Sequence, residues 1–240
     1  MSPDRDPLMS ADANRRMFDG IAGRYDLLNR LLTLGLDRRW RRRAAAALEP
    51  RAGGRYLDIG CGTGDVALGL LRQAPEALVT GVDPAQQMLA IAARKAQRAG
   101  VGPGRLSLSV GDAMALPFAD GAFDGIASAF TLRNFADRAA ALAEMRRVLA
   151  PGGRLAILET SVPRNPALRL GHWLHMHTAV PLLGWLFAGD ARAYCYLAAS
   201  TEALPPPSSI VAELGEAGFR DTSARSLTGG VVTLYTVMAC

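Results

Sequence analysis

The chain has 240 residues, of which 50% are hydrophobic and 20% are charged, so a folded protein with a large core is expected and disorder is excluded. Its three cysteines share no spacing typical of a disulfide framework or a zinc module, which excludes both as the basis of the fold. The net charge of +5 comes almost entirely from arginine, since Lys95 is the only lysine. Either a genome rich in G and C or an anionic partner accounts for this bias.

The N-terminus carries no apolar segment of the kind found in secretion signals, which favours a cytoplasmic protein. No stretch reaches the roughly 20 apolar residues of a membrane-spanning helix. The arginine run 38–43 contains Trp40 and favours peripheral contact with anionic lipid at the inner face of the cell membrane. A solvated amphipathic helix is the other interpretation, and no RNA-binding aromatic motif points to a nucleic-acid partner.

Residues 14–48 show the apolar spacing of helices, with leucines of the segment 27–34 on one face. From Arg55 onward, short apolar runs alternate with longer helical stretches, which favours an α/β fold with a mostly parallel sheet. Strands are expected at 56–60, 78–82, 106–110, 123–130, 154–159, 219–227 and 231–238, and helices at 63–73, 85–99, 137–149 and 209–216.

Residues 163–207 break this alternation. They are rich in aromatic side chains, contain all three histidines and end in three prolines. An apolar insertion at this point is typical of a lid or a substrate wall. The histidines are spaced by three and two residues, so one helix face cannot present them together and no metal site is expected.

The strongest motif is a glycine-rich turn between a predicted strand and a predicted helix. Its glycines fall at Gly60, Gly62 and Gly64, and Asp58 precedes them. A dinucleotide-binding turn that starts at Gly60 would need its third glycine at the position of Asp65, and no Gly-Lys-Ser/Thr motif exists. The pattern D-x-G-x-G-x-G instead resembles motif I of the Rossmann-like methyltransferases that use S-adenosylmethionine.

Two acidic residues close the next two predicted strands. Asp83 ends the second strand, where a carboxylate can accept hydrogen bonds from a ribose diol; its alternative role is to cap the following helix. Asp112 and Ala113 end the third strand and resemble the adenine-binding pair of the same methyltransferases. An exposed turn is the alternative for Asp112.

Further segments resemble the ubiquinone/menaquinone biosynthesis C-methyltransferases. They read MFDGIAGRYDLLN at 17–29, LDRRWR at 36–41, LRNF at 132–135, GDARAYCYL at 189–197 and LTGGVV at 227–232. The resemblance implies a seven-stranded, class I methyltransferase fold with an N-terminal helical extension, 1–50, and a methyltransferase domain, 51–240, with a lid at about 163–207. It also implies S-adenosylmethionine as cofactor and ring-carbon methylation of a polyprenylated quinol, either demethylmenaquinol or 2-polyprenyl-6-methoxy-1,4-benzoquinol.

The resemblance assigns further residues. Thr63 matches the threonine that helps to hold the cofactor, and Ser128 lies one position before a family serine whose place is taken by Ala129. Because neighbouring strand residues face opposite sides, Ser128 is an imperfect substitute. The family has a histidine in its last strand, and the corresponding residue here is about Tyr235. Residues 198–207 also depart from the family pattern.

For catalysis we expect Arg133 and Asn134 of the Leu-Arg-Asn motif to stabilise a phenolate or to hold a water, because arginine stays protonated. An ion pair with Asp137 is the alternative for Arg133. Tyr194 and Tyr196 are expected to hydrogen-bond the ring, or else to pack within the lid. The quinol, a membrane surface and no nucleic acid are the expected partners, and a homodimer is left open. A methyltransferase of another apolar phenol or lipid and a non-enzymatic cofactor-binding subunit are the competing hypotheses.

Overall fold

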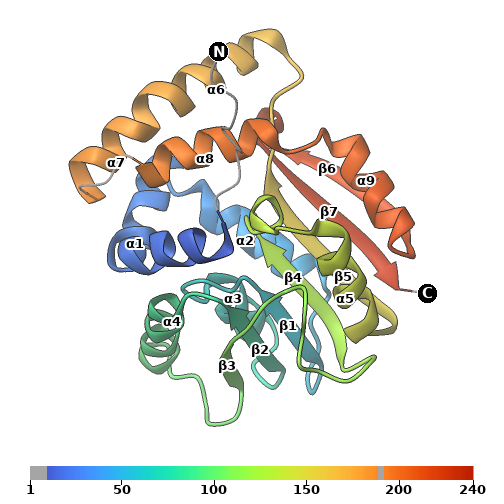
Figure 1. Cartoon of the computed structure of the whole chain (residues 1–240). Helices are drawn as coiled ribbons and strands as arrows, with labels where there is room; N and C mark the ends of the chain where they lie inside the picture. Colours follow the sequence, from blue (N-terminus) through green and yellow to red (C-terminus); the bar gives the residue numbers. More distant parts are fainter. Residues whose placement is uncertain (1–9, 189–191, 240) are drawn as a thin grey trace.

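The computed structural model describes residues 10–188 and 192–239, and for 185, 187, 188 and 192–194 it describes the backbone alone. Seven strands form one sheet in the order β3-β2-β1-β4-β5-β7-β6 (Figure 1). All neighbouring pairs are parallel except those of β7, which is antiparallel to both β5 and β6. The strands are β1 (Arg55–Ile59), β2 (Leu78–Asp83), β3 (Leu106–Val110), β4 (Phe123–Ala129), β5 (Leu149–Thr160), β6 (Phe219–Leu227) and β7 (Val232–Ala239). This confirms the predicted α/β class and the seven-stranded, mostly parallel sheet.

Helices cover both faces of the sheet because each buried strand presents apolar side chains to both sides. One core lies under α5 (Arg138–Val148) and α9 (Pro207–Glu216), and it includes Leu57 and Ile59 of β1. The other lies under α2 (Leu36–Ala47) and α3 (Asp65–Gln73), and it includes Tyr56 of β1. Alternate residues of one strand therefore stabilise opposite layers.

The N-terminal helical region is two helices, α1 (Ala11–Leu32) and α2, separated where Leu34 and Gly35 both adopt positive φ. Helix α1 packs on α4 (Gln86–Arg98) through a small apolar cluster that contains Ala22 and Met88. The extension therefore lies over the side of the sheet where β1 and β2 end.

The arginine run of α2 does not present its tryptophan to the surface. The Trp40 side chain is 5% exposed, and its indole Nε1 donates to Thr228 over 2.9 Å. Arg41 is also buried and forms an ion pair with Asp37 at 2.7 Å. The expectation of a lipid-facing tryptophan is therefore wrong, because the apolar stripe of α2 is used for the core.

The insertion after β5 is helical. It comprises α6 (Pro166–Leu174), a π-helical turn η2 (His175–Ala179), α7 (Val180–Ala188) and α8 (Arg192–Ala203), which form a layer above α1 and α2 (Figure 1). Met176 and Val180 pack against Leu28 and Leu32 of α1.

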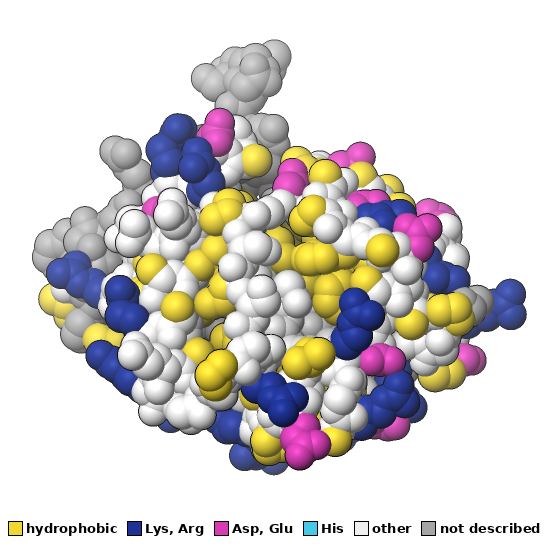
Figure 2. Space-filling model, turned by 90° about the horizontal axis from the view of Figure 1, so that it is seen from below, with side chains coloured by type: hydrophobic (Ala, Val, Ile, Leu, Met, Phe, Trp, Pro, Cys, Tyr) yellow, Lys and Arg dark blue, Asp and Glu magenta, His cyan; other side chains and the backbone are white. Residues whose placement is uncertain are grey.

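No helix in the described part of the chain is long and apolar enough to cross a membrane. Seen from below, hydrophobic side chains gather in the middle of one face, with basic and acidic side chains around them (Figure 2).

Candidate functional site

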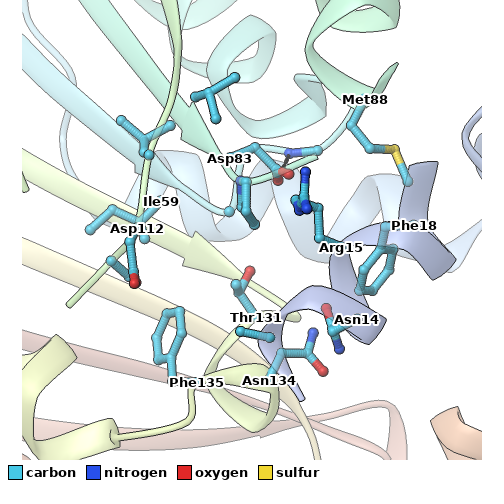
Figure 3. Close-up of a pocket in the computed structure, with 18 of the residues that line it drawn as sticks. Asn14, Arg15, Phe18, Ile59, Asp83, Met88, Asp112, Thr131, Asn134 and Phe135 are labelled. Carbon is cyan, nitrogen blue, oxygen red and sulfur yellow. Dashed lines mark hydrogen bonds between the residues drawn. The ribbon is translucent and has the colours of Figure 1, made fainter. Parts of the chain in front are cut away.

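A cleft of about 490 Å³ lies where β1 to β4 end and is covered by α1 (Figure 3). Ligand sites of doubly wound sheets occur at this edge, because the turns after parallel strands meet there. One part of the lining comes from the strand ends and the other from α1 and the segment after β4. The lining residues used below are Asn14, Phe18, Tyr25, Gly60, Gly62, Asp83, Asp112, Ala113, Phe130, Asn134 and Phe135.

The glycine loop follows β1 with positive φ at Gly60, Gly62 and Gly64. These angles are strained for other residues, which explains the spacing of the motif. At Gly62 no atom lies within 4 Å of the position that a Cβ would take, so the backbone is open to the cleft. Gly64 is the N-cap of α3, and a Cβ there would lie 3.0 Å from Ala92.

Asp83 connects the end of β2 to this loop. One carboxylate oxygen accepts from the Gly62 amide and the other from the Ala85 amide, both over 2.8 Å. Burial raises the pKa of Asp83, and the two amides act against that shift. A carboxylate has about four acceptor positions, so acceptor capacity remains for hydroxyl groups in the cleft.

Asp112 and Ala113 line the same cleft after β3. The Asp112 carboxylate accepts from the Met114 amide over 2.9 Å, which fixes the turn. Both residues therefore lie near Asp83, as their positions at adjacent strand ends predict.

Four other residues expected at the cofactor are absent from the described lining of the cleft: Asp58, Thr63, Gly64 and Ser128. Asp58 is buried and accepts from the Ala67 amide over 2.9 Å. Thr63 is also buried, and its hydroxyl donates to Asp26 over 2.6 Å. Ser128 is buried in β4 with no hydrogen-bond partner for its Oγ among the described residues.

Arg133 and Asn134 of the Leu-Arg-Asn motif occupy different environments. Asn134 lines the cleft, but Arg133 is absent from its described lining. The guanidinium of Arg133 is paired with Glu159 rather than with Asp137, whose carboxylate caps α5 through the Ala140 amide. Arg133 therefore lies behind the site, at a buried ion pair.

Tyr196 joins this region to α1. Its hydroxyl donates to Asn134 Oδ1 over 3.1 Å and accepts from Asn14 Nδ2 over 3.2 Å. The side chain of Tyr194 lies outside the described residues. Asn14 and Glu159 were not predicted from the sequence; an acidic residue near the end of the fifth strand was the one available signal for Glu159.

The residues present fit S-adenosylmethionine. The cleft combines an acidic acceptor suited to ribose hydroxyls at Asp83, an open backbone at Gly62 and a second acid at Asp112. Phenylalanine rings at Phe18 and Phe135 give the neighbouring part of the cleft an apolar wall. This fold and site together define a Rossmann-like methyltransferase that uses S-adenosylmethionine.

The comparisons identify the family. The model of the ubiE/COQ5 methyltransferase family matches residues 9–239, and the chain belongs to that family. It is 48% identical over 219 residues to a demethylmenaquinone methyltransferase of Thermus thermophilus, covering 91% of this chain and 98% of the relative. It is 42% identical to a ubiquinone/menaquinone biosynthesis C-methyltransferase of Geobacter sulfurreducens, covering 92% and 86% of the two chains. The predicted family and its cofactor are thereby confirmed, and the chain is an S-adenosylmethionine-dependent methyltransferase.

Solved structures support the fold. The [4+2]-cyclase SpnF aligns with a TM-score of 0.69 at 20% identity and covers 97% of both chains. A methyltransferase from Aquifex aeolicus aligns with a TM-score of 0.56 at 19% identity, covering 79% of this chain and 84% of its own. Since one of these proteins is a cyclase, the fold alone does not determine the reaction.

Proposed function

We propose that the protein transfers the methyl group of S-adenosylmethionine to a ring carbon of a polyprenylated quinol, with demethylmenaquinol as the first candidate acceptor. The observation that carries this proposal is the 48% identity, over nearly the full length of both chains, to a relative named for that reaction. The ubiquinone precursor 2-polyprenyl-6-methoxy-1,4-benzoquinol is the second acceptor, because other relatives are named for both pathways.

The cofactor side of the cleft is assigned to Asp83, Asp112, Ala113 and the glycine loop. When bound there, S-adenosylmethionine supplies an activated methyl group on a sulfonium. Asp83 would accept hydrogen bonds from the ribose hydroxyls while it holds the Gly62 amide. Asp58 and Thr63 would act behind the loop by fixing α3 and α1 against it.

The acceptor side is assigned to α1 and the segment after β4. Phe18, Phe130 and Phe135 would enclose an aromatic ring and exclude water from it. The oxygen of the Asn134 amide accepts a hydrogen bond from the Tyr196 hydroxyl, so the amide nitrogen remains to donate to a ring oxygen. Arg133 would hold the position of Asn134 through its ion pair with Glu159.

The acceptor assignment is tested with tritiated S-adenosylmethionine and the two reduced quinols offered separately. We expect the label on a ring carbon of demethylmenaquinol, located by mass spectrometry of the product. Transfer to the benzoquinol alone would reverse the order of the acceptors. Transfer to neither quinol, by protein that binds S-adenosylhomocysteine, would contradict the proposed substrate class.

We also propose that the continuous helix formed by α6, η2 and α7 contacts the inner face of the cell membrane, where a polyprenylated substrate resides. Between Glu159 and Asp190 the sequence has no acidic residue, and it includes Arg164 and Arg169. This composition complements an anionic lipid surface. Among the side chains of this helix that the structure describes, the exposed large apolar ones are Leu168, Leu170, Trp173, Leu174, Leu182 and Leu186.

Flotation with vesicles that contain phosphatidylglycerol tests this contact. The unaltered protein is expected to float, and L182S/L186S to remain in the dense fraction. L78S is the matched control, since Leu78 is 42% exposed at the start of β2. Equal flotation of L182S/L186S and the unaltered protein, or no flotation of either, would contradict the contact.

A further inference from the structure

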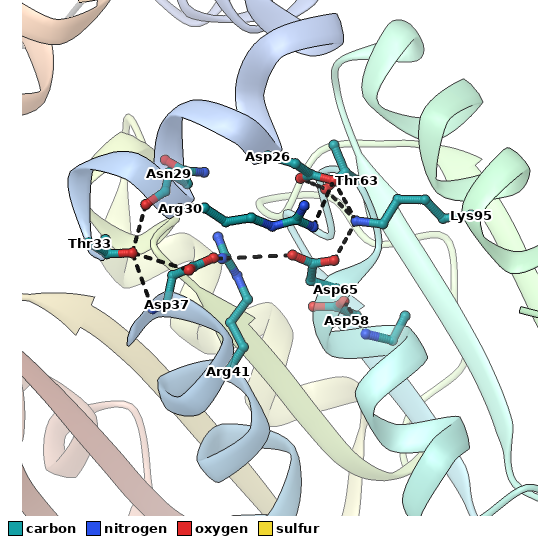
Figure 4. Close-up of polar contacts among 11 residues, drawn as sticks. Asp26, Asn29, Arg30, Thr33, Asp37, Arg41, Asp58, Thr63, Asp65 and Lys95 are labelled. Carbon is teal, nitrogen blue, oxygen red and sulfur yellow. Dashed lines mark hydrogen bonds and ion pairs between the residues drawn. The ribbon is translucent and has the colours of Figure 1, made fainter. Parts of the chain in front are cut away.

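Lys95 of α4 contributes its ammonium group to a polar cluster beside the cleft (Figure 4). Nζ donates to Asp26 Oδ2 over 2.8 Å, to Thr63 Oγ1 over 3.2 Å and to Asp65 Oδ1. The three protons of the ammonium therefore each have an acceptor. The Lys95 side chain is 20% exposed, so these interactions are partly shielded from water.

The three acceptors belong to separate parts of the fold. Asp26 lies on α1, Thr63 lies in the glycine loop, and Asp65 begins α3. Thr63 also donates to Asp26 over 2.6 Å, which closes the connection between α1 and the loop. One side chain thus joins the helix that covers the cleft to the loop that forms its floor.

The geometry suits lysine and not arginine. An ammonium is a compact charge whose donors diverge from one atom, whereas a guanidinium is a planar fork. The chain has 27 lysines and arginines in all, and Lys95 is the only lysine among them. The cluster therefore places the single side-chain ammonium of the chain where acceptors from α1, the glycine loop and α3 converge.

Two further cations lie next to the cluster. Arg41 of α2 is 3.9 Å from Asp65, and Arg30 of α1 is 4.0 Å from Asp26. Burial raises the pKa of Asp65, but Lys95 and Arg41 outweigh burial and hold that pKa below its ordinary value. Without Lys95, the carboxylates of Asp26 and Asp65 would lose the positive charge that both of them contact.

We propose that Lys95 is a positioning residue that couples the glycine loop to α1, so that cofactor binding at the loop stiffens the acceptor wall formed by α1. The wall residues Asn14, Phe18 and Tyr25 all lie on α1. The inference rests on the cofactor and the fold, and it holds whichever quinol is the acceptor.

Hydrogen exchange of α1 with and without S-adenosylhomocysteine tests the coupling. In the unaltered protein, we expect the ligand to slow exchange along α1, including the turn around Asp26. In K95M, slowing should be confined to the glycine loop, and the Kd of S-adenosylhomocysteine should rise about tenfold. K95R should not restore either property, because its fork cannot reach three convergent acceptors.

R94M is the matched control, because Arg94 is an exposed cation on the same helix. It should leave the Kd and the exchange of α1 unchanged. D26A removes only the α1 end of the connection, so it should lose the ligand-dependent slowing in α1 while the Lys95–Asp65 ion pair is kept. Ligand-dependent slowing of α1 that persists in K95M or D26A would overturn the inference.

A measurement on the unaltered protein avoids any effect of substitution on folding. Because the chain has one lysine, growth with ¹⁵N-lysine gives a single side-chain ammonium signal. We expect this signal to be visible through slow exchange with water and to move when S-adenosylhomocysteine binds. A signal that matches free lysine and ignores the ligand would overturn the inference. Both ligand experiments omit the acceptor, so failure of the quinol assay does not affect them.

Discussion

Arg133 and Glu159 form a two-point contact in the interior of the protein. Nη1 of Arg133 lies 2.5 Å from Oε1 of Glu159, and the Arg133 amide donates to Oε2 over 3.2 Å. The Glu159 side chain is completely buried. The positive charge of Arg133 therefore faces the carboxylate of Glu159 near the end of β5, whereas the next residue, Asn134, lines the cleft.

Removing one partner of the Arg133–Glu159 pair should strongly destabilise the folded protein. R133M leaves a buried carboxylate and E159Q leaves a buried guanidinium, so each should lower the free energy of unfolding by about 3–5 kcal/mol. The double variant R133M/E159Q should recover part of that loss. Urea unfolding of the three variants measures these differences.

The partly exposed pair Arg138–Glu213 is the control for this cycle, with a distance of 2.9 Å and side chains that are 29% and 27% exposed. R138M should cost about 1 kcal/mol or less, because solvent screens that pair. Equal costs for R133M and R138M would show that burial of the Arg133–Glu159 pair has no energetic consequence.

The Tyr196 hydroxyl links Asn14 of α1 to Asn134 by two hydrogen bonds. Losing them should affect turnover of the quinol acceptor more than binding of the cofactor. Burial raises the pKa of Tyr196, so its hydroxyl stays protonated and donates to Asn134. Y196F keeps the ring but removes both hydrogen bonds. We expect kcat/KM for the quinol to fall about tenfold, with the Kd of S-adenosylhomocysteine unchanged. A weaker affinity for S-adenosylhomocysteine at constant acceptor kinetics would place Tyr196 on the cofactor side instead.

The parts of the site that the sequence predicts are local. Asp83 and Asp112 each end a strand, and parallel strands bring their carboxyl ends to one edge of the sheet. The hydrogen bond from Asn14 to Tyr196 joins residues 182 positions apart, and no local pattern encodes it. The environment of Arg133 was also not predictable, because its partner Glu159 lies 26 residues away, on β5.

The lone lysine shows the same limit. Its rarity was visible in the sequence, but its acceptors come from α1, the glycine loop and α3, which only the packing of these elements brings together. The buried Trp40 illustrates the converse case. A basic run with an aromatic residue is typical of lipid-facing helices, but here the aromatic side chain of Trp40 is buried in the hydrophobic core beneath α2.

Asp83 should be required for cofactor affinity. D83A removes the acceptor of the Gly62 and Ala85 amides and the proposed acceptor of the ribose hydroxyls. We expect the Kd of S-adenosylhomocysteine to rise about 100-fold. D83N keeps one oxygen acceptor and should give an intermediate value by isothermal titration. An unchanged Kd in folded D83A would contradict the assignment of the cofactor half of the cleft.

The pH dependence of stability should report on Asp58. Burial raises its pKa to about 7, although the Ala67 amide and Arg41 act in the opposite direction. In the unfolded chain the carboxyl has a pKa of about 3.9. The folded state therefore holds this proton between roughly pH 4 and pH 7 while the unfolded state releases it, so stability falls with rising pH in that window and levels off above it.

D58N replaces the carboxyl by an uncharged group of the same shape, whose oxygen can still accept from the Ala67 amide. Its free energy of unfolding, relative to the unaltered protein, should therefore increase by at most about 4 kcal/mol between pH 4 and pH 8. Urea unfolding at intervals of one pH unit measures the difference. D58A also removes the titrating group but leaves the amide without its acceptor, so it should follow D58N in pH dependence at a constant lower stability. A difference between D58N and the unaltered protein that stays constant across this range would mean that Asp58 is already ionised in the folded state at low pH.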